Sequence, residues 1–168
     1  KLLNLDFVVI ISPIEMIACS IFFKIFLQRK FSHKAELIHL YSAKVRANPD
    51  DQKRLPRIDI AANPNTEFSI GGYLVRVVGA KGHTSGHIIF YLPEGNVLFC
   101  GDVLFSLGCG KLFEGTPDEM WKILQWIRSL PEDTKIYTAH EYTIENAQFA
   151  SLVEPNNIYL QNRMKEAH

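Results

Sequence analysis

The sequence lacks a long uninterrupted apolar segment. The most apolar stretch among its 168 residues is 7–27, and Pro13, Glu15 and Lys24 interrupt it. Its charge-free runs reach about eight residues, well below the ~18 that a membrane-spanning helix needs. A basic tripeptide follows this stretch, which keeps a membrane anchor open as an alternative. We favour a buried strand at Phe7–Ile11 followed by a helix-like segment, and we expect neither a signal peptide nor membrane attachment.

Cysteine is scarce and neither sign of charge is in excess. The three cysteines, Cys19, Cys100 and Cys109, have no paired spacing, so we expect no disulfide framework and a reducing, cytoplasmic compartment. Lysine and arginine number 18, as do aspartate and glutamate. A chain with this balance and no basic stripe is not expected to bind nucleic acid. We also find no internal repeat, and we expect a monomer.

The length fits a single domain, 1–168, with its own core. Segments rich in β-branched and aromatic residues, bounded by turn residues, predict strands. These strands are Tyr73–Val78, His87–Leu92, Val97–Cys100 and Lys135–Thr138. Between and before them, the proline-bearing segment Asn48–Asn65 and the glycine-rich segment Phe105–Gly115 are expected to be mostly loop, and Ser32–Ala47 a short amphipathic helix and a strand.

Helix signals are strongest after Thr116. Threonine as cap, Pro117 at the first position and Glu119 at the third predict a helix, and apolar residues then recur at helical spacing. Thr143 is expected to cap a second helix, Ile144–Leu152, and a third is expected near the C-terminus. The order of strands and helices predicts an α/β protein with helices covering strands.

Three polar side chains follow predicted strands directly, at loops far apart in the sequence. They are His83, Asp102 and His140. Imidazole and carboxylate groups at successive strand ends are a typical way to assemble a metal site. Each residue alone is explained as well by a hydrogen-bonded loop histidine or a turn-capping aspartate. Together they favour a metal site.

A glycine-rich loop, residues 108–115, carries Lys111 and Phe113. A lysine in such a loop beside a metal could bind an anionic substrate, and a solvated surface lysine is the alternative. His33 and His39 lie in a polar region and are expected at the surface.

At this point three motifs resemble one family. They are Gly-His-Thr-Ser-Gly-His at 82–87, Gly-Asp followed by Gly-Cys-Gly-Lys within 101–111, and Ala-His-Glu-Tyr-Thr at 139–143. In this order and spacing they resemble glyoxalase II, the hydroxyacylglutathione hydrolases of the metallo-β-lactamase superfamily. Glu-Pro-Asn-Asn at 154–157 matches the same family, and the likeness extends from residue 43 to the C-terminus, with 1–42 divergent.

The resemblance implies a four-layer αβ/βα sandwich with a binuclear metal centre, usually of zinc, with iron or manganese as alternatives. It implies hydrolysis of the glutathione thioester S-lactoylglutathione to lactate and glutathione, as part of methylglyoxal detoxification. His83 would bind the first metal, Asp102 would bridge both, and His140 would bind the second, which makes Asp102 and His140 the catalytic candidates. Lys111 and Tyr142 would contact the glutathione moiety.

Three features of the family pattern are not found: a tyrosine, an N-terminal metal motif and the family's C-terminal extension. Phe113 occupies a substrate-contact position where the family often has tyrosine, and the motif Thr-His-x-His-x-Asp-His, which supplies four metal ligands, is not found. A catalytic zinc ion typically has three protein ligands of its own. We therefore expect weak metal affinity, activity below that of an intact relative, and a fold incomplete at both ends. The alternatives are a non-catalytic remnant or binding protein, and another superfamily enzyme such as a persulfide dioxygenase.

Overall fold

The computed structural model describes residues 8–11, 16–19, 44–55 and 57–167. A five-stranded sheet forms the centre, in the order β11-β8-β7-β6-β5. Neighbouring strands from β5 to β8 are antiparallel, whereas β11 is parallel to β8. The strands are β5 (Thr66–Ile70), β6 (Tyr73–Gly79), β7 (Ile88–Leu92), β8 (Val97–Gly101) and β11 (Lys135–Thr138).

A smaller four-stranded sheet has the order β2-β1-β3-β4. Its strands are β1 (Val8–Ile11), β2 (Met16–Cys19), β3 (Lys44–Ala47) and β4 (Ile60–Ala61). Between β3 and β4 the chain forms the 3₁₀ helix η1 (Pro49–Arg54), and a second short one, η2 (Pro93–Gly95), joins β7 to β8. A two-stranded ribbon of β9 (Leu104–Phe105) and β10 (Gly108–Cys109) follows β8.

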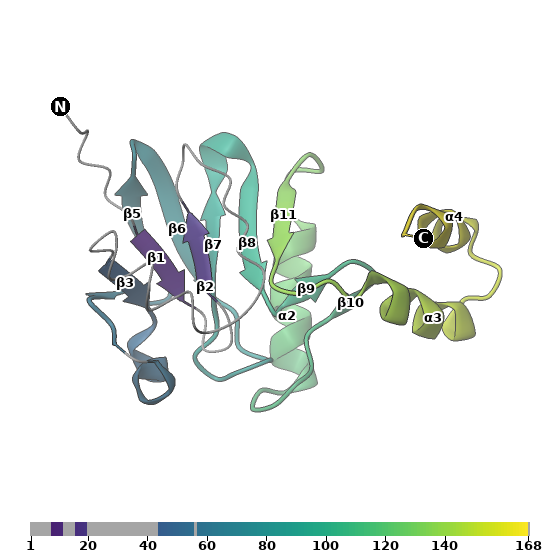
Figure 1. Ribbon diagram of the computed structural model, residues 1–168, viewed down its shortest axis with the longest axis horizontal. Coiled ribbons are helices and arrows are strands. Elements are labelled where there is room, and N and C mark those ends of the chain that lie inside the picture. The colour runs from purple at the N-terminus through teal and green to yellow at the C-terminus, as the bar shows by residue number, and fades with distance from the viewer. Residues whose placement is uncertain (1–7, 12–15, 20–43, 56, 168) are drawn as a thin grey trace.

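Three α-helices complete the described part of the chain: α2 (Pro117–Arg128), α3 (Thr143–Val153) and α4 (Ile158–Ala167). In Figure 1, α2 lies against one face of the five-stranded sheet and the smaller sheet lies on the other, while α3 and α4 extend beyond β9 and β10. The described residues thus provide three of the four layers that the family resemblance implies. Among them, no helix is both long enough and apolar enough to cross a bilayer.

The central strand β7 is buried on both of its faces, which explains its continuous run of apolar residues. Ile89 and Tyr91 pack in a cluster with Met120, Ile123 and Ile127 of α2. The alternate residues Ile88 and Phe90 belong to a second cluster with Val75 and Val77 of β6. Successive strand residues point to opposite faces, so one strand contributes to both cores.

Most elements agree with the sequence-based expectations, including all four predicted strands of the large sheet and the helix that Thr116 begins. The helix-like segment expected after Phe7–Ile11 is wrong at residues 16–19, where β2 pairs antiparallel with β1. Its remainder, like the amphipathic helix expected after Ser32, lies outside the described residues. The 48–65 segment also contains η1 and β4, which the loop prediction missed.

Thr143 is not the cap of α3 but its first residue. The cap position is Tyr142, whose side chain makes no capping hydrogen bond. The backbone N–H and the hydroxyl of Thr143 instead both donate to the Glu141 carboxylate. A carboxylate just before a helix accepts the unpaired N–H groups there and favours the helix dipole.

Candidate metal centre

Three strands of the large sheet have their C-terminal ends on the same side of the sheet. β6 and β8 both run antiparallel to β7, and β11 runs parallel to β8, so the C-terminal ends of all three strands lie together. His83 follows β6, Asp102 follows β8 and His140 follows β11. The sheet topology therefore brings the three predicted residues to one place, although 57 positions separate the first from the last (140 − 83).

The three side chains are in contact. His83 Nε2 lies 3.6 Å from Asp102 Oδ2, and His140 Nδ1 lies 2.8 Å from Asp102 Oδ1. His83 and Asp102 are buried, whereas the side chain of His140 is 36% exposed. The Asp102 carboxylate is thus at the centre, with one imidazole on each of its oxygens.

The surroundings of His83 determine which ring nitrogen faces Asp102 as an acceptor. His83 Nδ1 lies 2.7 Å from the carbonyl oxygen of Lys111, so Nδ1 carries the proton and donates it there. Nε2, the other ring nitrogen, faces Asp102 Oδ2. Both atoms are buried, and neither has a hydrogen-bond partner among the residues that the structure describes. A buried acceptor pair of this kind needs a shared cation or proton between its members.

The spacing of that pair fits a divalent cation. Two donor atoms, each about 2.0–2.2 Å from one tetrahedral ion, lie roughly 3.3–3.6 Å apart. His83 Nε2 and Asp102 Oδ2 have this separation. The backbone carbonyl on Nδ1 is also the usual way in which a protein orients a histidine ligand. These residues therefore fit part of a metal site.

The coordination shell is not complete in the described part of the chain, where no group of three or more histidine, cysteine or acidic side chains is arranged to hold a metal. His140 Nδ1 contacts Asp102 Oδ1 directly. A full site thus needs ligands beyond these three residues, as the missing N-terminal motif predicts.

His87, to which the sequence motifs assigned no role, contacts the backbone of Asp102. The Asp102 backbone N–H points to His87 Nε2 at 3.4 Å. His87 is only 1% exposed, and burial lowers the pKa of its imidazole to about 4, so the ring is neutral. The second histidine of the Gly-His-Thr-Ser-Gly-His motif therefore supports the backbone that carries Asp102.

Gly110 also packs closely against the backbone of Asp102. A Cβ atom at position 110 would lie 1.7 Å from the carbonyl oxygen of Asp102. The Gly110 N–H also donates to Val103 O at 3.2 Å. Only glycine allows this approach, which explains the residue between Cys109 and Lys111.

The three residues predicted to contact substrate surround the centre and are accessible. The Phe113 ring lies edge-on to His83, with 5.0 Å between ring centroids, and Lys111 Nζ lies 5.2 Å from the Phe113 centroid. The Tyr142 ring stacks on His140, with centroids 5.3 Å apart. Phe113 and Tyr142 are exposed. Their role in substrate binding stays a prediction.

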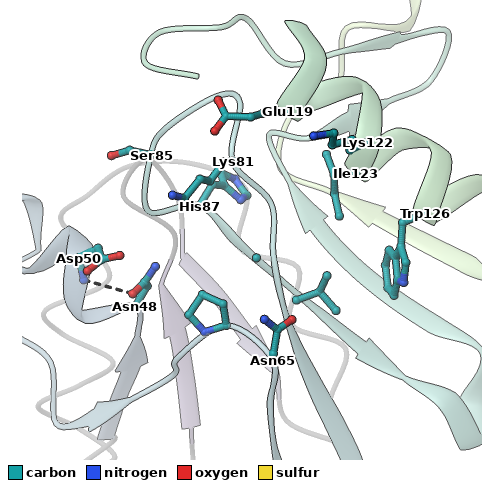
Figure 2. Close-up of a pocket in the computed structure, with 13 residues that line it drawn as sticks. Asn48, Asp50, Asn65, Lys81, Ser85, His87, Glu119, Lys122, Ile123 and Trp126 are labelled. Atoms are coloured by element: carbon teal, nitrogen blue, oxygen red, sulfur yellow. Dashed lines mark hydrogen bonds between the residues drawn. The ribbon is translucent and has the colours of Figure 1, made fainter. Parts of the chain in front are cut away.

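A pocket of about 450 Å³ lies beside the centre, not at it (Figure 2). Its lining comes from η1, the loop that follows β6, and α2, and Figure 2 shows His87 and Lys81 between Asn48 on one side and Trp126 on the other. His83, Asp102 and His140 do not line it. Of its lining residues, His87 contacts the centre, at the backbone N–H of Asp102.

The comparisons with known proteins agree with this geometry. The family model described as the metallo-beta-lactamase superfamily matches residues 25–140. A hydroxyacylglutathione hydrolase of Methylococcus capsulatus is 47% identical over 115 residues, which cover 68% of this chain and 45% of that protein. Another from Ruegeria pomeroyi is 46% identical over 132 residues, covering 79% and 52%. The chain spans about half the length of the curated relatives it matches.

Solved structures share the fold. ETHE1 from Myxococcus xanthus matches with a TM-score of 0.56 at 23% identity, over 64% of this chain and 47% of that one. A metallo-beta-lactamase from Pontibacter korlensis matches with a TM-score of 0.52 at 19% identity, over 71% and 62%. At such identities the likeness concerns the fold alone. Together with the family match over more than half of its residues, it shows that the chain belongs to the metallo-beta-lactamase superfamily.

Proposed function

We propose that this chain forms the metal-site half of a hydroxyacylglutathione hydrolase, a metal-dependent enzyme that hydrolyses thioesters such as S-lactoylglutathione. The observation that carries the proposal is the pair of buried acceptors, His83 Nε2 and Asp102 Oδ2, 3.6 Å apart at the edge where three strands end. The names of relatives at 46–47% identity support the substrate class. Superfamily membership implies a divalent metal, and we propose zinc.

The residues that would hold the cation are His83 and Asp102, with His140 beside them. A divalent cation bound there would supply Lewis-acid chemistry, because it would polarise a carbonyl and lower the pKa of a bound water molecule toward neutrality. Lys111 O accepts from Nδ1 of His83, which leaves Nε2 to face the cation. Burial keeps Asp102 away from bulk water and close to its two imidazole neighbours.

The rim of the centre suits an anionic, peptide-like thioester. Lys111 offers a cation beside the exposed ring of Phe113, and the Tyr142 hydroxyl provides a hydrogen-bonding group on the His140 side. A glutathione thioester carries carboxylates for a lysine and amides for a tyrosine hydroxyl. Phe113 cannot supply the hydroxyl that a tyrosine would provide at its position, so we infer weaker substrate binding than in an intact relative.

A thioester assay tests the proposal. Purified protein is stripped of metal with a chelator, and hydrolysis of S-lactoylglutathione is followed by thiol release with and without added zinc. We expect zinc-dependent turnover in the wild type and its loss in Asp102→Asn. The control is Asp59→Asn, because the Asp59 carboxylate, directly before β4, accepts the backbone N–H of Val45 and is not among the residues of the candidate centre. Equal turnover in wild type and Asp102→Asn would refute the proposal.

A second candidate is a non-catalytic relative, favoured by the incomplete coordination shell among the described residues. In that case the protein folds, with the same pair of His83 and Asp102, but shows no zinc-dependent turnover. The same assay separates the two functions.

A further inference from the structure

Two loops that meet at the metal centre are joined by a ladder of backbone hydrogen bonds. The N–H of Gly115 donates to Gly82 O at 3.0 Å, and the N–H of Phe113 donates to His83 O at 3.2 Å. His83 Nδ1 adds the contact of 2.7 Å to Lys111 O. The orientation of the His83 ring therefore depends on how the 111–115 segment is placed against the 82–86 segment.

Glu114 continues this ladder with its side chain. Its Oε2 accepts from the backbone N–H of Ser85 at 2.8 Å and from the Ser85 hydroxyl at 2.9 Å. Its Oε1 forms an ion pair with Arg54, the last residue of η1. These hydrogen bonds and the guanidinium lower the pKa of the Glu114 carboxyl to about 2, so it is ionised at neutral pH.

The helix η1 holds the 82–86 segment from a second direction. Asn48 Nδ2, at the cap of η1, donates to Gly86 O at 2.8 Å, and Asp51 lies against Gly86. A Cβ atom at position 86 would lie 2.5 Å from Asp51 Oδ2, so this approach requires glycine. Glu114 thus connects three segments: the loop of His83, the loop of Lys111, and η1.

We propose that Glu114, held by Arg54, is a positioning residue for His83. Its carboxylate accepts hydrogen bonds from Ser85 and so fixes the 82–86 segment against the 111–115 segment. This arrangement keeps His83 Nδ1 hydrogen-bonded to Lys111 O and Nε2 directed at Asp102. Glu114 does not touch the reacting atoms in this arrangement, because its carboxylate is occupied by Ser85 and Arg54. The role of His83 as a ligand rests on the proposed function, whereas its orientation by Glu114 does not.

The test uses Glu114→Gln, with Glu119→Gln as the matched control. Glu119 also accepts a backbone N–H and a hydroxyl, both from Thr116, but it does so at the start of α2, outside the ladder. Two measurements on metal-free protein report the orientation directly. One is amide hydrogen exchange at Phe113 and Gly115, and the other is the ¹⁵N spectrum of the His83 ring, which distinguishes its tautomers.

In Glu114→Gln the charge-assisted hydrogen bond from the Ser85 N–H to the Glu114 carboxylate is lost. We therefore expect amide hydrogen exchange at Phe113 and Gly115 to accelerate roughly tenfold or more. We also expect the Nδ1–H tautomer of His83 to lose its predominance. Glu119→Gln should leave both readouts unchanged, and Glu114→Asp should restore part of the protection. Zinc affinity, measured by competition with a chromogenic chelator, should fall about tenfold to a hundredfold in Glu114→Gln only.

Exchange within a factor of two of the wild type, with the tautomer unchanged, would overturn the proposal. Failure of the proposed function looks different. If the wild type neither turns over thioester nor binds zinc, yet Glu114→Gln still frees Phe113 and Gly115 and alters the His83 tautomer, then the positioning role holds and the enzymatic role does not.

Discussion

Two imidazoles lie against the Asp102 carboxylate, one at each oxygen. His140 Nδ1 is 2.8 Å from Oδ1, and His83 Nε2 is 3.6 Å from Oδ2. The shorter distance is that of a hydrogen bond, whereas the longer one exceeds it. The wider gap is also the buried one, because His83 is 6% exposed. The geometry therefore places the room for a cation between His83 and Asp102.

Gly110 protects this geometry, and replacing it should disturb Asp102. In Gly110→Ala the new Cβ would lie 1.7 Å from the Asp102 carbonyl oxygen, which is backbone and cannot rotate away. We expect a loss of about 3 kcal/mol or more in the free energy of unfolding, measured by urea denaturation. The control is Gly95→Ala, whose Cβ would meet only a Val97 methyl group at 3.6 Å. Equal stability of the two variants would contradict the packing described here.

Leu98 is expected to be the costliest truncation in β8. It is fully buried in the cluster between the large sheet and α2, so Leu98→Ala leaves a cavity. We expect a loss of about 2–5 kcal/mol in the free energy of unfolding. Leu152→Ala removes the same atoms from a side chain that is 83% exposed, and it should change stability by no more than about 0.5 kcal/mol. Thermal and urea denaturation compare the two.

The capping box at Thr116 should contribute measurably to α2. The Thr116 hydroxyl accepts the Glu119 N–H, while the Glu119 carboxylate accepts the Thr116 N–H. Thr116→Ala removes the first of these bonds and should cost about 0.5–2 kcal/mol. Thr116→Ser keeps the hydroxyl and should retain most of the stability. If the alanine and serine variants unfold at the same denaturant concentration, the cap makes no contribution.

Glu114 should make part of the stability depend on acid. Its pKa is lowered from 4.5 to about 2, first by the Ser85 N–H and then by Arg54. In the unfolded chain the carboxyl gains a proton near 4.5, whereas the folded protein resists protonation until about 2. The stabilisation by Glu114 is thus fully present above pH 4.5, declines as the pH falls from 4.5 to about 2, and is absent below about pH 2.

The measurement for this pH effect is the difference in melting temperature between wild type and Glu114→Gln. That difference should be largest above pH 4.5 and should shrink toward pH 2. Asp51 and Arg54 face Glu114, and burial raises the pKa of Asp51, but both residues are present in both proteins and their effects largely cancel. A difference that does not vary with pH would show that Glu114 is not held as a carboxylate.

The sequence predicted the large sheet well because each strand carries a local signal. β7 is continuously apolar, β8 ends at Gly101-Asp102, and α2 begins with a capping box that Thr116, Pro117 and Glu119 make visible. The convergence of His83, Asp102 and His140 also followed, because residues after strands that run in the same direction share one edge. Superfamily membership is confirmed by the family match.

What the sequence could not supply are interactions between residues far apart in the chain. Arg54 and Glu114 are separated by 60 positions, and neither lies in a pattern that indicates the other. The same holds for Asn48 and Gly86, which are 38 apart. β2 was mistaken for a helix-like segment because a short apolar run does not distinguish the two, and only pairing with β1 decides it.

The direction of the strands also separates the protein into two sides with different tolerance to change. Since β6, β8 and β11 all finish at the end of the sheet that carries the candidate metal centre, the tight turn at Gly71-Gly72, the η2 connection and the 131–134 turn lie at the opposite end. A fluorescent label or an inserted peptide placed in those three connections would sit a full strand length away from Asp102. They are the natural positions for attaching reporters to this domain without disturbing the candidate metal centre.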